Sequence, residues 1–237
     1  MKLSVPIYRL KRQARLLSRA ERIPLHQALD RVARGEGFKS WSLLAAQAAA
    51  RVPAQSLLAE LNGGELMLLG ARPGHGKTLL SLELLIQAMK LGQRGVFFSL
   101  EYNEADIIAC FAAVGEDARL YRDRFEFDND DAISGPYIMR QLDSAARGTV
   151  VVVDYLQLLD QKRDNPALTD QVAALKAFAR ERELILVFIS QIDRSYDASQ
   201  QKCPELADVR LPNPLDLELF DKACFLHDEE MTMASVG

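Results

Sequence analysis

Two kinds of hydrophobic pattern follow one another along the chain. In residues 1–51, apolar positions recur at three- and four-residue spacing among basic residues, which is typical of amphipathic helices. We expect one helix over 8–19 and a second from Pro24 to Gly35, because proline suits a first helical turn and glycine suits a helix end. A third helix is expected to begin after Ser40, a favourable N-cap. The pattern therefore predicts a small all-helical module.

From about Ser56 the pattern changes to short apolar runs that alternate with longer helical stretches. Alternating strands and helices predict a parallel sheet that is covered by helices on both faces. The segment 150–153 is valine at every position, as expected of a central strand whose two faces are both buried. The expected strands are 65–70, 95–100, 124–127, 149–154, 184–190 and 223–226, and the expected helices between them are 78–90, 103–114, 133–146 and 168–182.

The composition is that of a globular protein. Of the 237 residues, 49% are hydrophobic and 26% are charged, which excludes a disordered or collagen-like chain. No stretch is apolar enough to span a membrane, and the N-terminus does not resemble a signal peptide. The three cysteines form no C-x-x-C pair, so the sequence predicts neither a zinc ribbon nor a disulfide framework. We expect a cytoplasmic protein.

The formal net charge of −4 conceals an asymmetry. Residues 1–51 hold 11 of the 29 basic residues and three of the 33 acidic ones, a net of +8, so that the remainder carries −12. A basic arm on an acidic body predicts two modules with different partners. We expect a basic helical N-terminal module over 1–53 and an α/β domain over 54–237.

The strongest chemical signal is the segment 70–78, which follows an expected strand and opens an expected helix, as a phosphate-binding P-loop does. Gly74 and Gly76 would let backbone N–H groups turn toward phosphate oxygens, and the N-terminus of the helix would attract the same anion. Lys77 would reach the β- and γ-phosphates of ATP, and Thr78 would bind Mg²⁺. A plain turn with a chance Lys-Thr pair is the alternative. The expected nucleotide-binding residues are Ala71, Arg72, Pro73, Gly74, His75, Gly76, Lys77 and Thr78.

Three further expected strands end in polar residues. Asp154 follows the valine run and would hold the water shell of Mg²⁺ beside Thr78. Glu101 is a candidate general base for an attacking water, and Gln191 would contact the γ-phosphate and report its loss. Each residue alone would be an ordinary strand end. Because the strand tips of a parallel sheet converge on one crevice, we expect all three to meet near Lys77.

These motifs together resemble those of the DnaB-like replicative helicases. The segment 71–78 (ARPGHGKT) is similar to the family's Walker A motif, which also begins Ala-Arg-Pro and also has Ala where the strict P-loop pattern has Gly. The segment 99–101 (SLE) resembles the motif that carries the catalytic glutamate, 154–157 (DYLQ) resembles the Walker B motif, and 190–191 (SQ) resembles the sensor motif. The resemblance covers about 57–230 and implies a RecA-like P-loop NTPase core, in which helices flank a parallel central sheet.

The resemblance also implies an activity and partners. It implies an ATPase that uses Mg²⁺, assembles into a ring or joins another ATPase subunit, and moves along single-stranded DNA, with no membrane partner. Lys77, Glu101 and Gln191 would be the catalytic residues, and Thr78 and Asp154 the metal ligands. Candidate DNA contacts are the loop residues Lys162, Arg163, Arg194 and Lys202, and the basic arm, for which DNA and protein partners remain equally open.

Two departures from the family bear on the activity. The N-terminal arm does not resemble the family's primase-interacting domain, and Lys222 is the last cationic residue of the sequence, before the place where the family carries a Lys-x-Arg pair. Without such an arginine finger, hydrolysis would fall by roughly three to five orders of magnitude. We therefore expect a DNA helicase or a helicase-derived ATPase. The alternatives are an ATP-binding switch or loader that lacks unwinding activity, a RecA/RadA-type recombination accessory ATPase, and a non-enzymatic DNA-binding adaptor.

Overall fold

The chain divides into two compact units, Met1–Pro53 and Ala54–Gly237. Among the described helices, none combines the length and the apolar character that crossing a membrane requires. The computed structural model describes residues 5, 7–41, 44, 53–73, 75–160, 164–193, 195–196, 203–211, 213–227 and 230–236.

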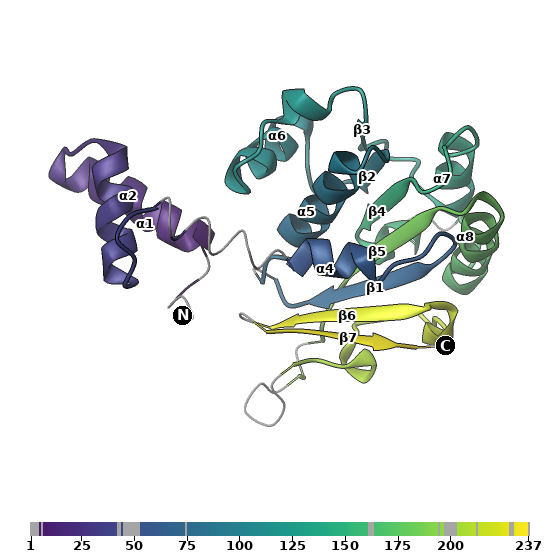
Figure 1. Ribbon diagram of the computed structural model, residues 1–237. Coiled ribbons are helices and arrows are strands. Elements are labelled where there is room, and N and C mark those ends of the chain that lie inside the picture. Colours follow the sequence, from purple (N-terminus) through teal and green to yellow (C-terminus); the bar gives the residue numbers. More distant parts are fainter. Residues whose placement is uncertain are drawn as a thin grey trace. The chain divides into compact units, whose positions relative to one another are not determined.

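The N-terminal unit is built on two helices, α1 (Ile7–Glu21) and α2 (Leu25–Gly35), which pack against each other (Figure 1). Their contact is apolar, because Leu10 of α1 and Ala33 of α2 belong to one buried cluster. The backbone N–H of Trp41 donates to the Asp30 carboxylate at 2.8 Å, which fastens the segment after α2 to that helix. The two helices expected here are confirmed, and α1 begins one residue earlier and ends two residues later than the pattern predicted.

The second unit is built on a seven-stranded sheet with the order β3-β2-β4-β5-β1-β6-β7 (Figure 1). The first six strands in this order are parallel, and β7 runs antiparallel to β6. This arrangement, with its flanking helices, confirms the expected α/β fold. The strands are β1 (Leu66–Ala71), β2 (Gly95–Ser99), β3 (Phe125–Asp128), β4 (Val150–Asp154), β5 (Ile185–Gln191), β6 (Lys222–His227) and β7 (Glu230–Ser235).

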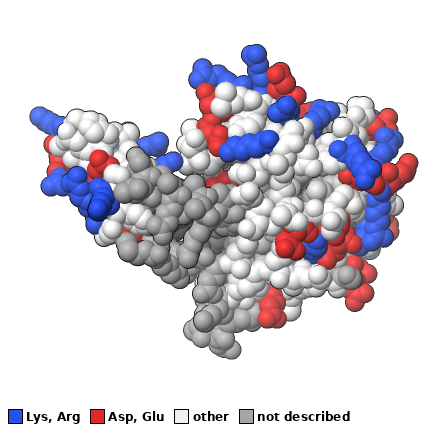
Figure 2. All heavy atoms as spheres, viewed as in Figure 1, with Lys and Arg blue, Asp and Glu red and all other residues white. Residues whose placement is uncertain are grey.

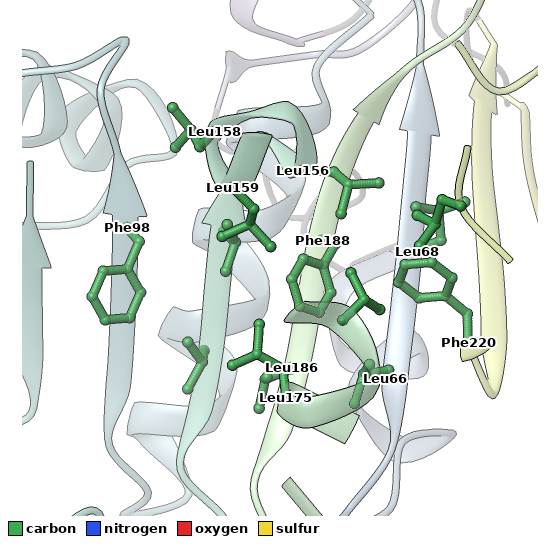
Figure 3. Packing of buried hydrophobic residues seen from close by; sticks show 14 of the residues in the cluster. Leu66, Leu68, Phe98, Leu156, Leu158, Leu159, Leu175, Leu186, Phe188 and Phe220 are labelled. Carbon is green, nitrogen blue, oxygen red and sulfur yellow. The ribbon is translucent and has the colours of Figure 1, made fainter. Parts of the chain in front are cut away.

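Helices cover both faces of the sheet. On one face, α7 (Gly135–Gln141) and α8 (Leu168–Arg182) lie side by side (Figure 1). Figure 3 shows part of the core beneath them, where Leu175 of α8 shares one buried cluster with side chains of β1 and β5. On the other face lies α5 (Lys77–Lys90), because a Cβ atom at Gly95 of β2 would meet the Leu85 side chain at 3.3 Å. The neighbouring Val96 belongs to the α7–α8 face.

Three elements differ from the expectation. The helix expected over 133–146 is only α7, because Ser134 caps its start and the turn after it is held by Arg182, which donates to the Asp143 carboxylate at 2.8 Å. One α-helix and one strand were not predicted: α4 (Pro53–Ala59), a single short helix, and β7, whose only large apolar residues are Met231 and Met233. Both are too short, or too weakly patterned, to produce a periodic signal. The remaining helix of this unit, α6 (Glu104–Ala113), begins at a capping box on Asn103.

Candidate active site

The loop between β1 and α5 carries the residues expected to bind a nucleotide. Ala71 ends β1, and Lys77 and Thr78 form the first turn of α5, both partly buried. Gly76 caps the helix with a φ of 83°, and a Cβ atom at this position would meet nothing within 4 Å. Glycine is therefore required here for its backbone conformation and not for space. The first turn of α5 holds no acidic residue, so its N-terminus stays attractive to an anion.

Asp154 ends β4 and lies next to this helix. The Thr78 hydroxyl donates a hydrogen bond to Asp154 Oδ2 at 3.2 Å, which joins residues 76 positions apart in the sequence. Asp154 is fully buried, and among the described residues its Oδ1 has no hydrogen-bond partner. Burial raises the pKa of Asp154 to about 6, while the positive charge of Lys77 opposes this shift and the negative charge of Glu101 adds to it. The charges of Lys77 and Glu101 therefore act at one carboxylate, as the strand ends predicted.

Glu101 lies two residues beyond the end of β2, and its side chain is exposed. Its backbone N–H donates to the Ser99 hydroxyl at 3.1 Å, and Ser99 lies beside Asp154 in the register of β2 and β4. Glu101 is therefore an exposed carboxylate near the buried Asp154, the expected metal ligand, and it has access to solvent. Such a group is able to accept a proton from water.

Tyr102 is a member of the site that the sequence did not reveal. Its hydroxyl donates to Thr78 Oγ1 at 3.4 Å, so that the Thr78 hydroxyl contacts Tyr102 on one side and Asp154 on the other. Burial raises the pKa of the Tyr102 phenol, which therefore keeps its proton. The contact depends on how β2 sits beside α5 in three dimensions, and the only sequence signal was the position of Tyr102 directly after Glu101.

Gln191 lies on a different side of the loop. It ends β5 beside Ala71 of β1, and its carbonyl accepts from the backbone N–H of Arg210 at 2.8 Å. It lines a cavity of about 300 Å³ together with Arg72, Pro73, Ile192 and Arg210. Within the described residues, no hydrogen bond joins Gln191 to Thr78 or Asp154. The fold thus places Gln191 at the P-loop strand, but not at the Thr78–Asp154 pair.

Two histidines that lie far apart in the sequence, His75 and His227, meet at the P-loop. The ring of His75 stacks on that of His227, at the end of β6, with the centroids 5.1 Å apart. Tyr196 packs edge-on against His227 at 5.5 Å, and the Arg72 guanidinium lies 5.1 Å from the Tyr196 ring centroid. Arg72 also donates to the Tyr196 carbonyl. This chain of contacts connects the loop after β1 to β6, and no spacing in the sequence predicted it.

The Thr78–Asp154 pair fits a Mg²⁺ ion. A fully buried carboxylate oxygen without a hydrogen-bond partner has lost its hydration without replacement, which favours a bound cation. Hydroxyl and carboxylate oxygens are hard ligands of the kind that Mg²⁺ prefers, and this ion commonly binds one or two protein groups together with phosphates and water. The predicted site residue Gly74 and the candidate DNA contacts Lys162, Arg163, Arg194 and Lys202 lie outside the described residues.

Comparisons with known proteins point to one family. Residues 133–235 match the model of the DnaB-like helicase C-terminal domain. The chain is 28% identical over 180 residues to the replicative DNA helicase DnaB of Helicobacter pylori (strain J99), covering 63% of this chain and 37% of that protein. It is 25% identical over 202 residues to the DnaB of Leifsonia xyli, covering 71% and 44%. The chain thus spans less than half the length of these relatives.

Solved structures show the same fold. A DnaB-like replicative helicase, whose structure was described with its interactions with primase, matches with a TM-score of 0.59 at 21% identity, covering 71% of this chain and 48% of that one. A solved ATPase domain matches with a TM-score of 0.60 at 20% identity, covering 74% and 75%. The expected resemblance to the DnaB-like replicative helicases is therefore confirmed, and the second unit has the fold of their ATPase domains.

Proposed function

We propose that the second unit binds and hydrolyses ATP with Mg²⁺, as part of a DnaB-like, helicase-type activity. One observation carries this proposal. The first turn after the P-loop presents Thr78 to the buried Asp154, and the charges of Lys77 and Glu101 act at the same carboxylate. The loop expected to bind phosphate, the two expected Mg²⁺ ligands and the candidate base would therefore act together at one edge of the sheet. The similarity to the DnaB helicases supports the same interpretation.

The residues divide the chemistry between them. Backbone N–H groups of the loop, the N-terminus of α5 and the Lys77 ammonium would hold the phosphates. Thr78 and Asp154 would hold Mg²⁺, which when bound neutralises charge on the phosphate oxygens. Glu101 would orient the attacking water and accept its proton, because its side chain is exposed at the end of β2. Gln191, beside the P-loop strand, would respond to the γ-phosphate from the cavity that it lines with Arg72 and Arg210.

Replacing Lys77 tests the nucleotide site. Lys77→Ala removes a charge held against phosphate oxygens, so we expect ATP affinity to fall by about 10- to 100-fold while the fold is kept. Lys90→Ala is the matched control, because Lys90 lies in the last turn of the same helix and pairs with Glu116 at the surface. Binding is measured with a fluorescent ATP analogue, and folding by circular dichroism. An unchanged ATP affinity in the Lys77 variant would rule out the P-loop assignment.

The coupling to DNA is the finer part of the proposal. Because this chain is similar to proteins named replicative DNA helicases, we propose single-stranded DNA as its partner. A homo-oligomeric ring or another ATPase subunit would complete the assembly. ATP turnover of the purified chain, measured with and without a single-stranded oligonucleotide, separates the alternatives. We expect stimulation by DNA. Nucleotide binding without stimulation would instead support a switch or loader that lacks unwinding activity.

A further inference from the structure

Helix α1 exposes a stripe of four arginines, Arg9, Arg12, Arg15 and Arg19, called here the α1 stripe. Their spacing of three or four residues places them on neighbouring turns of one side of the helix. The buried side of α1 carries Leu10, which is 1% exposed, and Ala14, which is 0% exposed. The stripe is therefore held toward solvent by the packing of the opposite side against the rest of the unit.

Carboxylates do not neutralise the stripe. In the part of the chain that the structure describes, none of the four arginines takes part in an ion pair, and the nearby Glu21 is paired with Arg31 of α2. Several arginines of the second unit differ in this respect, since Arg94 pairs with Glu126 and Arg182 pairs with Asp143. The difference matters because an arginine without a carboxylate partner is available to an anion from another molecule.

The surroundings of the stripe strengthen its positive potential. The described residues of the N-terminal unit include nine cationic and three acidic side chains, a net of +6. Lys11 lies in the same helix, one turn before Arg15. Figure 2 shows Lys and Arg atoms exposed on this unit. The stripe therefore lies on a unit whose overall charge has the same sign.

We propose that the α1 stripe binds the phosphate backbone of a nucleic acid, without reading its sequence. From Arg9 to Arg19 the helix rises about 15 Å, which corresponds to about four phosphates of one strand of a duplex, at about 3.4 Å each along the duplex axis. Among the side chains of α1 that the structure describes, Leu16 is the only exposed large apolar one, at 57% exposed, whereas the centre of a protein interface is usually rich in aromatic residues. A regular row of charges with one exposed leucine suits a repeating anion better than it suits a folded protein surface.

The proposal goes beyond the ATP site, because no residue of the stripe belongs to the segment 71–78. Phosphate binding of this kind releases counterions, so affinity falls steeply with salt. The affinity for nucleic acid is measured on the 237-residue chain without ATP. The probe is a fluorescein-labelled single-stranded oligonucleotide of mixed sequence, used over a series of salt concentrations. ATP affinity is measured separately on each variant, so that failure of this proposal and failure of the ATPase proposal are distinguishable.

A quadruple variant and a control with the same charge change test the stripe. Replacing Arg9, Arg12, Arg15 and Arg19 by Gln keeps good helix formers in α1 while it removes four charges. The control replaces Arg119, Arg122, Arg140 and Arg147 of the second unit by Gln. We expect the stripe variant to lose more than about 10-fold in affinity and to lower the slope of log affinity against log salt by about 3, at about 0.7 per phosphate. The control variant should keep most of the affinity and most of the salt dependence.

Three outcomes would overturn the proposal. The first is an unchanged affinity and slope in the stripe variant. The second is an equal loss in the stripe variant and the control, which would reduce the effect to net charge. The third is a loss of self-association, measured by analytical ultracentrifugation, with DNA binding intact, which would assign the stripe to a protein partner. Circular dichroism shows whether α1 is still helical in the quadruple variant. If the helix is lost, the double variant Arg12→Gln/Arg19→Gln is used instead. We expect it to change the slope by about half as much.

Discussion

Asp154 concentrates the electrostatics of the candidate site in one side chain. Its burial is unfavourable for the ionised form, and only one of its two oxygens accepts a hydrogen bond among the described residues. A group of this kind destabilises the protein on its own and becomes favourable when a cation binds. The site therefore has a measurable cost in the protein without metal, and that cost depends on pH.

The pH dependence of stability follows from the pKa of Asp154. This pKa is about 6 in the folded chain and about 4 in an unfolded one. Between these pH values the folded state binds more protons than the unfolded state, so the free energy of unfolding falls as pH rises through this window. Asp154→Asn cannot ionise and keeps an oxygen for Thr78. We expect it to be more stable than the wild type without metal by about 2–3 kcal/mol at pH 8, and nearly equal to it at pH 4.

Urea unfolding at a series of pH values measures this difference. Asp123→Asn is the control, because Asp123 is almost fully exposed and its nearest cationic atom, on Arg122, is 3.9 Å away. It should change stability little at any pH. A gain in the Asp154 variant that is the same at pH 4 and pH 8 would contradict the assignment, since it would show that ionisation is not its cause.

Replacing Glu101 should slow ATP hydrolysis, whereas replacing Lys77 should weaken ATP binding. Because Glu101 is exposed and contributes no hydrogen bond to the P-loop among the described residues, Glu101→Gln should leave ATP affinity unchanged. Loss of the general base should slow hydrolysis by about 100-fold or more. Glu104→Gln, in the exposed first turn of α6, serves as the control for a change of charge. If Glu101→Gln weakened binding as much as Lys77→Ala, a role for Glu101 in holding the metal or the fold would replace the role of base.

At the scale of elements, a buried glutamine joins the segments around β4. Gln171 of α8 accepts from the backbone N–H of Gly135, at the start of α7, at 2.7 Å. Its amide nitrogen donates to the carbonyls of Leu159 and Pro166, each at 2.7 Å. Leu159 lies in the short helical turn that follows Asp154. One side chain therefore fixes two helices and the turn after the candidate metal ligand.

Removing this glutamine should destabilise the unit strongly. Gln171→Leu fills a similar volume but leaves the Gly135 N–H and the Pro166 carbonyl without their partner, each costing about 1–3 kcal/mol. The Leu159 carbonyl keeps a hydrogen bond from the Asn165 amide at 3.1 Å. We expect the free energy of unfolding to fall by about 3 kcal/mol or more, as measured by urea denaturation. Gln55→Leu, at an exposed position of α4, is the control and should have little effect. A loss below about 1 kcal/mol would show that other groups satisfy these atoms.

The elements that the sequence predicted are those with long or uniform patterns. The strands around 150–153 and 184–190 were predicted to within one residue because continuous apolar runs have few alternative structures. The helix over 168–182 was predicted without error. The start of α7 was missed by two residues, because Ser134 is held as a cap by a local hydrogen bond that the apolar periodicity does not record.

At the scale of the whole molecule, the sequence predicted which residues end strands but not which strands are neighbours. Lys77, Thr78, Glu101, Asp154 and Gln191 were expected together because the strand ends of a parallel sheet share one edge. For Gln191 this was only partly right, since it lies beside the P-loop strand but away from the Thr78–Asp154 pair. The separate position of Gln191, the contact of Tyr102 with Thr78 and the stacking of His75 on His227 all depend on the order of the strands. Hydrophobic period identifies a strand, and only tertiary packing selects its partners.

The strand order also has a consequence for how the chain is made. The strand β1, fully buried and entirely apolar, lies between β5 and β6, although β5 begins only at Ile185. At about 5–20 residues per second, a ribosome needs roughly 6–23 s after Ala71 before Ile185 is even synthesised. Throughout that interval the strand that leads into the P-loop has no neighbour to pair with. A nascent chain that stops anywhere before Gln191 thus exposes an entirely apolar strand, and a chaperone that shields apolar segments would be needed most during this interval.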